Sequence, residues 1–271
     1  MEAKDLKEKL FNEKKNAWEK VTDEEKTKIF DFAEDYKTFI SENKTERECV
    51  KGIKTLLEEK GFKNVDEIET LKPGDKVYFI NREKSIYASI IGEESPEKGF
   101  NIIGAHIDSP RLDLKPNPIY ESEEIAMFKT HYYGGIKKYQ WVNIPLSMHG
   151  VIIKENNEKV EIKIGEEEND PIFTIADLLP HLSSKQDKKP IKDAIEAENL
   201  NIIIGSVPYK GDIEEKVKLN ILNILNEKYG IKEEDFISAE IEFTPTMKAK
   251  DLGFDRALIA GYGQDDRECA Y

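Results

Sequence analysis

The spacing of apolar residues changes near Lys76, and this change constrains the fold more than any other feature of the sequence. Before about residue 60, apolar residues recur at steps of three and four, which predicts amphipathic helices. The residues of this pattern are Ile29, Phe32, Ala33, Tyr36, Phe39 and Ile40. From Lys76 onward the apolar runs are short and of β type. A chain with both patterns in succession is expected to form a mixed α/β structure.

Two capping boxes mark where the N-terminal helices begin. Thr22 is followed three residues later by Glu25, and Thr45 by Glu48. In this arrangement each side chain bonds a backbone N–H group that the first helical turn leaves free. Gly61 is expected to end the second helix, since glycine adopts the left-handed conformation of a helix C-terminus without strain.

Short apolar runs separated by polar turns predict hairpins. Residues 77–80 and 86–91 flank the polar turn 81–84, and a third run at 101–106 is expected to be another strand. Later in the chain, residues 151–154 and 159–164 flank a polar turn and predict a second hairpin.

The second half also contains a helix, a strand and a polar segment. Residues 213–229 have helical spacing and end before Gly230, and residues 238–243 alternate as a strand. The polar stretch 183–200 is expected to be an exposed loop with a short helix. The sequence therefore predicts an α/β domain over 1–117, a β-rich insertion over 118–245, and a return to the first domain over 246–271.

Charge and cysteine content exclude several classes of partner and site. The chain has 55 acidic and 41 basic residues, a formal net charge of −14, which repels nucleic acid and anionic lipid surfaces. No apolar run is long enough to span a bilayer. Cys49 and Cys269 stand far apart in sequence without metal-ligand spacing, which favours a reducing cytoplasm over a disulfide framework.

His106 is the most informative of the four histidines because Asp108 follows it two positions later, at the end of an apolar run. Residues two apart in a strand share a face, so the carboxylate can accept the second ring proton of the imidazole. That contact fixes the tautomer and makes the other nitrogen a better metal ligand. The pair alone is more often a hydrogen-bonded structural pair than a metal site.

Asp265 and Asp266 form the second candidate, after the glycine-rich turn 261–263. Adjacent carboxylates cannot share one face of a regular element, so one would bind a metal and the other would shape the loop. Taken by itself, such a segment is more often a solvated acidic turn paired with Arg267 than a metal site, because exposed Asp and Arg are ordinary surface residues.

Four ordered segments change the balance between these interpretations, because together they resemble the aspartyl aminopeptidase family. They are Gly104-Ala105-His106-Ile107-Asp108-Ser109-Pro110-Arg111-Leu112 with Lys115-Pro116, then Tyr133-Gly134-Gly135-Ile136 running on to Trp141, then Leu178-Leu179-Pro180-His181-Leu182, and finally Gly261-Tyr262-Gly263-Gln264-Asp265-Asp266-Arg267. The resemblance implies the catalytic domain of a metallo-aminopeptidase, incomplete in this chain, with the β-rich insertion serving oligomerisation.

The resemblance also implies a role for particular residues. His106 matches a histidine that binds one of two active-site metal ions, and Asp108 matches the catalytic-site carboxylate that orients it. Asp265 matches the carboxylate that bridges both ions, and its peptide bond to Asp266 is often cis in related enzymes. His181 matches a histidine that reaches the substrate site of a neighbouring subunit in a homo-oligomer.

The expected activity is the release of N-terminal residues from peptides by water activated between two metal ions. Zinc is the expected metal, and cobalt or manganese also suits a carboxylate-rich site. The resemblance places the general-base glutamate and the other ligands after the Asp-Asp-Arg segment, so we expect this chain to be a fragment or inactive alone. The alternative is a non-catalytic assembly or regulatory module that retains the oligomer contacts. His131 and His149 match no ligand and are expected to be structural.

Overall fold

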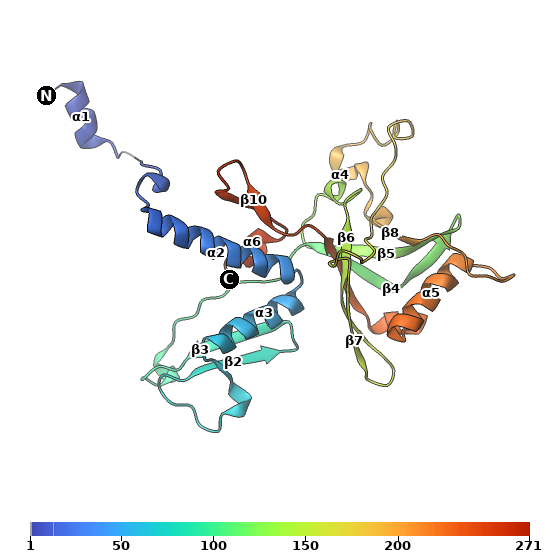
Figure 1. Cartoon of the computed structure of the whole chain (residues 1–271), viewed down its shortest axis with the longest axis horizontal. Helices are drawn as coiled ribbons and strands as arrows, with labels where there is room; N and C mark the ends of the chain where they lie inside the picture. Colours follow the sequence, from blue (N-terminus) through green and yellow to red (C-terminus); the bar gives the residue numbers. More distant parts are fainter. Residues whose placement is uncertain (1, 13) are drawn as a thin grey trace.

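The computed structural model describes residues 2–12 and 14–271, and its N-terminal part is helical as the sequence predicts. The helices are α1 (Ala3–Leu10), α2 (Asp23–Glu42) and α3 (Glu46–Glu59). Figure 1 shows α1 extending away from the rest of the molecule, whereas α2 and α3 lie against it. No helix in the described ranges has the length and apolar character that a membrane crossing requires.

Local signals position α2 and α3. Both predicted capping boxes are present, with Thr22 accepting from the Glu25 N–H and Thr45 accepting from the Glu48 N–H. Gly61 follows α3 with φ of 83°, in the left-handed region, and its N–H donates to the Glu58 carbonyl at 2.9 Å. The predicted helix boundaries are therefore confirmed, because each rests on contacts between residues close in sequence.

The first predicted hairpin forms a small sheet beside α3. Its strands are β1 (Lys63–Asn64), β2 (Lys76–Asn81) and β3 (Ser85–Ile90), in the order β1-β2-β3. Arg82 and Glu83 have φ of 51° and 61°, which gives the turn the twist that joins two antiparallel strands. Figure 1 shows α3 lying across β2 and β3.

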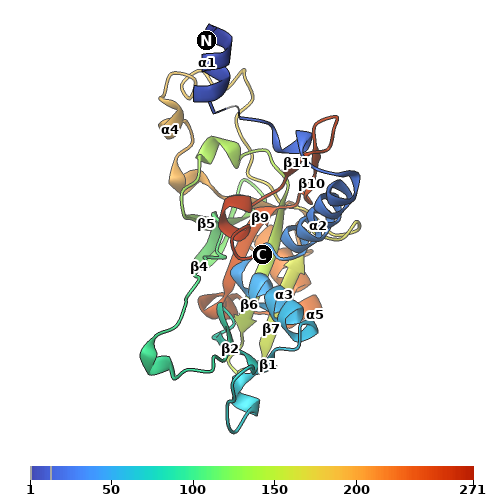
Figure 2. The ribbon, with the colours of Figure 1, turned by 90° about the vertical axis from the view of Figure 1, so that its left-hand side faces the viewer.

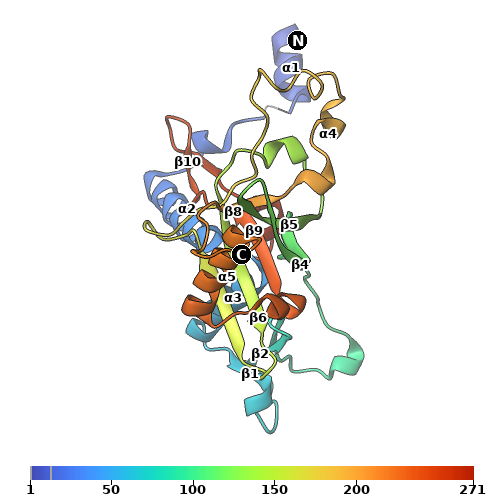
Figure 3. The same ribbon diagram turned by 90° about the vertical axis from the view of Figure 1, so that its right-hand side faces the viewer.

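The second half of the chain is dominated by a six-stranded antiparallel sheet of order β7-β6-β9-β4-β5-β8. Its strands are β4 (Arg111–Ser122), β5 (Ile125–Tyr133), β6 (Leu146–Ile153), β7 (Lys159–Ile164), β8 (Ile202–Gly205) and β9 (Glu240–Pro245). The second predicted hairpin is confirmed as β6 and β7. Helix α5 (Lys216–Tyr229) ends at Gly230 as predicted and packs against β4, β5 and β8, as Figure 3 shows.

This sheet and α5 enclose the largest apolar core of the chain. Buried residues of this core come from β4, β5, β6, β8, β9 and α5, among them Leu112, Phe128, Met148, Ile202, Leu225 and Phe243. The segment 183–200 is exposed with a short helix, α4 (Ile191–Ala194), as predicted. Two of its apolar residues depart from that description, since Ile195 and Leu200 are buried in the core and anchor the loop.

The expected domain boundary at residue 117 lies inside a strand. Arg111 through Leu114 already pair with β5, so β4 begins before the boundary. The register shifts between Leu114 and Ile119, and Asn117 there has φ of 54°. The prolines at 116 and 118 therefore mark an irregularity within one strand, and a boundary that respects the sheet precedes Arg111.

The prediction of a strand at 101–106 is wrong for this structure. Residues 101–110 have no regular secondary structure, and Ile102 and Ile103 are 76% and 96% exposed. In Figure 1 the chain between β3 and β4 runs as an open connection. An apolar strand is stable only where neighbouring strands bond its backbone and other elements cover its faces. None of the described residues does this for 101–106.

The chain's last elements return to α2. Strands β10 (Lys250–Leu252) and β11 (Leu258–Ala260) form a small hairpin, followed by the single turn α6 (Gln264–Arg267). Figure 2 shows α6 and the C-terminus close to the helices of the N-terminal part. Tyr271 packs against Tyr36 and Phe39 of α2, with ring centroids 5.3 and 5.1 Å away.

Candidate metal centre

Three segments that are far apart in sequence meet beside the start of β4. They are the loop around Asp108, the end of β5, and the segment that leads into α6. The Tyr133 hydroxyl donates to Asp108 Oδ2 at 2.5 Å, and the Tyr262 hydroxyl donates to the Pro110 carbonyl at 2.8 Å. The structure thus brings together the segments that contain His106, Asp108 and Asp265.

Asp108 faces the ring of His106. His106 Nδ1 lies 3.4 Å from Asp108 Oδ1 and 3.2 Å from the Asp108 backbone oxygen. Because both neighbours are acceptors, Nδ1 is the nitrogen that must hold the proton of a neutral ring. Nε2 is then left with its lone pair, and the side chain is 59% exposed. This is the arrangement that a histidine needs in order to bind a metal through Nε2.

Asp108 is kept in its charged form by its surroundings. The Tyr133 hydroxyl, by donating to the carboxylate, is the main cause that holds the pKa of Asp108 below its ordinary value, while partial burial opposes the shift. A charged Asp108 accepts hydrogen bonds from both sides and stabilises a protonated Nδ1 on His106.

Sequence reasoning gave no role to Tyr133 or Arg111, although both lie in the segments that resemble the family. The Arg111 guanidinium lies 4.1 Å from the centre of the Tyr133 ring. It is buried and forms ion pairs with Asp113 at 2.8 Å, Glu46 at 3.2 Å and Glu242 at 3.3 Å. Their role depends on contacts between α3, β4, β5 and β9, which no single stretch of sequence displays.

Asp265 lies in α6. Just before this turn, the backbone at Gly263 approaches the Ser109 side chain closely. Gly263 has φ of 65°, and a Cβ atom there would lie 2.4 Å from Ser109 Oγ. Only glycine therefore allows α6 to approach the Asp108 loop so closely. Asp265 itself is exposed. No peptide bond is cis among residues 2–12 and 14–271, so the expected cis bond between Asp265 and Asp266 is absent.

Arg267 does not form the solvated ion pair considered from the sequence. Its side chain is fully buried, and it donates to the carbonyls of Gly263 at 2.9 Å and Ile40 at 3.0 Å. It also bonds the carbonyls of Asn43 and Tyr262. Arg267 therefore joins α6 to the C-terminal end of α2. Its guanidinium bonds backbone carbonyls instead of the carboxylates of Asp265 and Asp266.

His181 is not brought to the other candidates. It lies in the exposed loop 178–182, whose Leu178, Leu179 and Leu182 side chains are also largely exposed. Within the described part of the chain, no hydrogen bond or ion pair joins His181 to His106, Asp108 or Asp265.

His149 lies away from these segments, in a buried charged network. Its Nδ1 is 2.9 Å from Glu48, and its Nε2 is 2.9 Å from Ser147 Oγ and 3.0 Å from Glu166. Burial works against the charged ring, yet the two carboxylates raise the pKa of His149 above its ordinary value. Burial also opposes ionisation of Glu48 and Glu166, but His149 holds the pKa of each at about 2. Lys44 donates to Glu166 at 2.7 Å.

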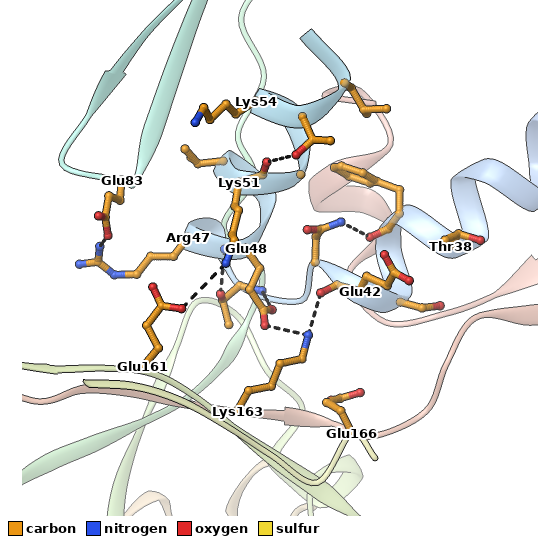
Figure 4. Close-up of a pocket in the computed structure, with 18 of the residues that line it drawn as sticks. Thr38, Glu42, Arg47, Glu48, Lys51, Lys54, Glu83, Glu161, Lys163 and Glu166 are labelled. Carbon is orange, nitrogen blue, oxygen red and sulfur yellow. Dashed lines mark hydrogen bonds and ion pairs between the residues drawn. The ribbon is translucent and has the colours of Figure 1, made fainter. Parts of the chain in front are cut away.

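This network borders a cleft of about 1120 Å³ between α2, α3 and the β6–β7 hairpin. Figure 4 shows Lys163 extending from β7 toward α2 and α3, where it lies 3.3 Å from both the Glu42 carbonyl and Glu48. Arg47 and Lys51 form further ion pairs across the cleft with Glu83 and Glu161. The facing charges pair with one another, so this cleft joins the two halves of the chain.

The described residues supply only part of a metal site. No three His, Cys, Asp or Glu side chains come together in a group that could hold a metal ion within residues 2–12 and 14–271. One imidazole and one carboxylate nevertheless fit zinc, which binds nitrogen and oxygen ligands.

Comparison with known proteins identifies the family to which the chain belongs. Residues 39–271 match the family described as aminopeptidase I zinc metalloprotease (M18). A probable M18 family aminopeptidase 1 of Clostridium acetobutylicum is 54% identical over 267 residues, which is 97% of this chain and 57% of that protein. The chain therefore spans little more than half the length of this relative.

Solved structures show the same fold. The crystal structure of an M18 family aminopeptidase from Thermotoga maritima superposes with a TM-score of 0.90 at 48% identity, covering 96% of this chain and 57% of that one. A dodecamer of the S. cerevisiae protein mApe1 has a TM-score of 0.60 at 21% identity, covering 84% and 51%. The second likeness concerns the fold alone.

Proposed function

The chain belongs to the aminopeptidase I zinc metalloprotease (M18) family, and on that premise we propose that it forms part of an aminopeptidase that releases N-terminal residues from peptides. The observation that supports the proposal most is the meeting of the Asp108 loop with the segment leading into α6. The segments that contain His106 and Asp265 are neighbours through this contact, although they are far apart in sequence, and this supports assigning both residues to one site.

The chain's own residues would divide the work of holding the metal. His106 would bind through Nε2, because its Nδ1 faces Asp108. Asp108 would fix the ring and its tautomer without touching the metal. Asp265, which is exposed in α6, would supply a carboxylate ligand. Zinc, when bound, would polarise a peptide carbonyl and lower the pKa of a coordinated water.

The other ligands and the general base belong to the part of the family site that the resemblance places after the α6 segment. We propose zinc as the working metal, with cobalt or manganese as substitutes, since carboxylate oxygens accept all three ions. His106, Asp108 and Asp265 are this chain's share of a two-metal site.

We also propose a homo-oligomer in which the six-stranded sheet forms an inserted assembly domain. The sheet has its own core, which a separate domain requires. The exposed loop 178–182 has three leucines beside His181, and a neighbouring subunit would cover them. His181 would then reach the substrate site of that subunit. A cytoplasmic location agrees with two free cysteines.

The proposal is tested by zinc- or cobalt-dependent release of N-terminal residues from short peptides by a protein that contains this chain. His106→Ala should abolish the release, because the metal loses its imidazole. His131→Ala is the matched control, since that ring stacks on Tyr132 and lies in β5. Full activity of His106→Ala would rule out the proposed site.

A further inference from the structure

Asp108 uses its two carboxylate oxygens for different partners. Oδ2 accepts from the Tyr133 hydroxyl at 2.5 Å, and Oδ1 lies 3.4 Å from His106 Nδ1. The first contact is the shorter of the two and comes from a regular strand. Because a carboxylate is planar, fixing Oδ2 also fixes the direction in which Oδ1 points.

Tyr133 is itself held firmly. It is the last residue of β5 and pairs in register with Arg111 of β4. Its ring lies against the Arg111 guanidinium, at 4.1 Å from the ring centre. Arg111 in turn is paired with Glu46 of α3 and Glu242 of β9, both buried. Contacts with β4, and through Arg111 with α3 and β9, therefore fix the position of the Tyr133 hydroxyl.

The segment that contains His106 and Asp108 lacks such constraints of its own. Residues 101–110 form no helix or strand, and the Asp108 side chain is 38% exposed. Without a fixed donor, an exposed aspartate changes rotamer and bonds water instead. His106 Nδ1 would then lose one of its two acceptors, and only the Asp108 backbone oxygen at 3.2 Å would remain to favour a proton there.

We propose that Tyr133 is a positioning residue for the metal ligand His106 and acts through Asp108. Its hydroxyl fixes the carboxylate, and the carboxylate adds to the Asp108 backbone oxygen as an acceptor at Nδ1, so that the proton stays on Nδ1 and Nε2 is free for zinc. Tyr133 touches neither metal nor peptide. The inference rests on the proposed function, because it assigns His106 as a zinc ligand.

Tyr133→Phe tests the inference, since it removes the hydroxyl and keeps the ring on Arg111. Long-range proton–nitrogen NMR of the metal-free chain, at a pH where the ring is neutral, should show less of the Nδ1–H tautomer of His106. The zinc dissociation constant should rise about tenfold, as when an outer partner of a ligand is removed. Thermal melting should show that the variant remains folded.

Tyr132→Phe is the matched control, because it removes a hydroxyl from the neighbouring residue of β5, whose ring stacks on His131. It should change neither the tautomer nor the zinc affinity. An unchanged tautomer and affinity in Tyr133→Phe would overturn the inference, and so would equal effects of the two variants.

His106→Ala separates this inference from the proposed function. If that variant binds zinc as the wild-type chain does, the proposed metal site is wrong. If it loses zinc while Tyr133→Phe retains wild-type tautomer and affinity, only the role of Tyr133 is wrong.

Discussion

The six-stranded sheet and the segment from β3 to β4 both contain apolar runs, but only the sheet buries them. In the sheet, Leu112, Leu146 and Phe243 are fully buried against α5 and neighbouring strands. In the other region, Ile102, Ile103 and the β3 residue Ile90 are largely exposed. An apolar run thus becomes a strand only where the chain supplies its neighbours.

The proposed metal ligand His106 lies where the two regions meet. His106 ends the exposed segment, whereas Tyr133 and Arg111 belong to the sheet. The segment from β3 to β4 has little regular structure of its own, so contacts with the sheet determine the geometry around His106. The predictions below test this difference in packing.

The largest effect is expected from Phe243→Ala in the centre of the six-stranded sheet. The ring is fully buried and contacts Phe128 and Phe173 at centroid distances of 6.0 and 5.5 Å. Its removal should lower the free energy of unfolding by about 3–5 kcal/mol, measured by urea denaturation. A loss below about 1 kcal/mol would mean that this sheet is not the main core.

Arg267→Ala should have the next largest effect on the free energy of unfolding. The change leaves the carbonyls of Ile40 and Gly263 without their buried donor and separates α6 from α2. The free energy of unfolding should fall by about 3 kcal/mol. Arg256→Ala is the control, because Arg256 is exposed and its pair with Asp251 should contribute little.

Hydrogen exchange should show where the Arg267→Ala effect is localised. We expect faster exchange in α2 and α6 and unchanged exchange in β6 and β9. Loss of protection in the sheet as well would contradict the division into two regions.

His149→Gln should have a smaller effect that depends on pH. The folded-state pKa of His149 is raised, so its stabilisation is complete below the unfolded value of 6.5 and is lost as pH rises through the folded value. The pKa of Glu48 and Glu166 is lowered to about 2, so their stabilisation holds above 4.5 and is lost as pH falls toward 2. The two windows overlap between 4.5 and 6.5.

Urea denaturation at about pH 5.5 and pH 9 measures this dependence. The variant should be destabilised by about 1–2 kcal/mol at the lower pH and by less at the higher one. Lys44 and Lys163 face the same carboxylates in the variant and in the wild-type chain, so the comparison at each pH isolates the imidazole. His131→Gln, at an exposed position, should show no such difference. A deficit for His149→Gln that grows with pH would contradict the assignment.

The smallest effect is expected from Ile103→Ser in the exposed segment. Because this side chain is already in water, the free energy of unfolding should change by less than about 0.5 kcal/mol. Light scattering should show less self-association, since an exposed apolar side chain is removed. A large destabilisation would show that the segment is packed after all.

Contacts between close residues made much of the fold predictable. The capping boxes at Thr22 and Thr45 and the hairpin around Arg82 depend on residues within one turn. The strand expected at 101–106 failed because its neighbours lie elsewhere. The boundary expected at residue 117 falls inside β4, because the pairing of Arg111 through Leu114 with β5 joins residues that are far apart in sequence.

The same limit applies to the site. His106 and Asp108 were recognised together because they are two residues apart, and the structure confirms that they face each other. Tyr133 lies within a segment that resembles the family, but its contact with Asp108 spans 25 positions. Arg267 was read as a surface residue, since nothing near it in sequence shows that backbone carbonyls surround it.

The central claim is that His106 and Asp265 belong to one metal site, and zinc binding by the two single variants and the double variant tests it most directly. Calorimetric titration of His106→Ala and Asp265→Ala should each show a zinc affinity at least about tenfold lower than that of the wild-type chain. The double variant should bind no more weakly than the weaker single one, because both changes damage the same site. Wild-type affinity in either single variant, or losses that simply add, would contradict a shared site.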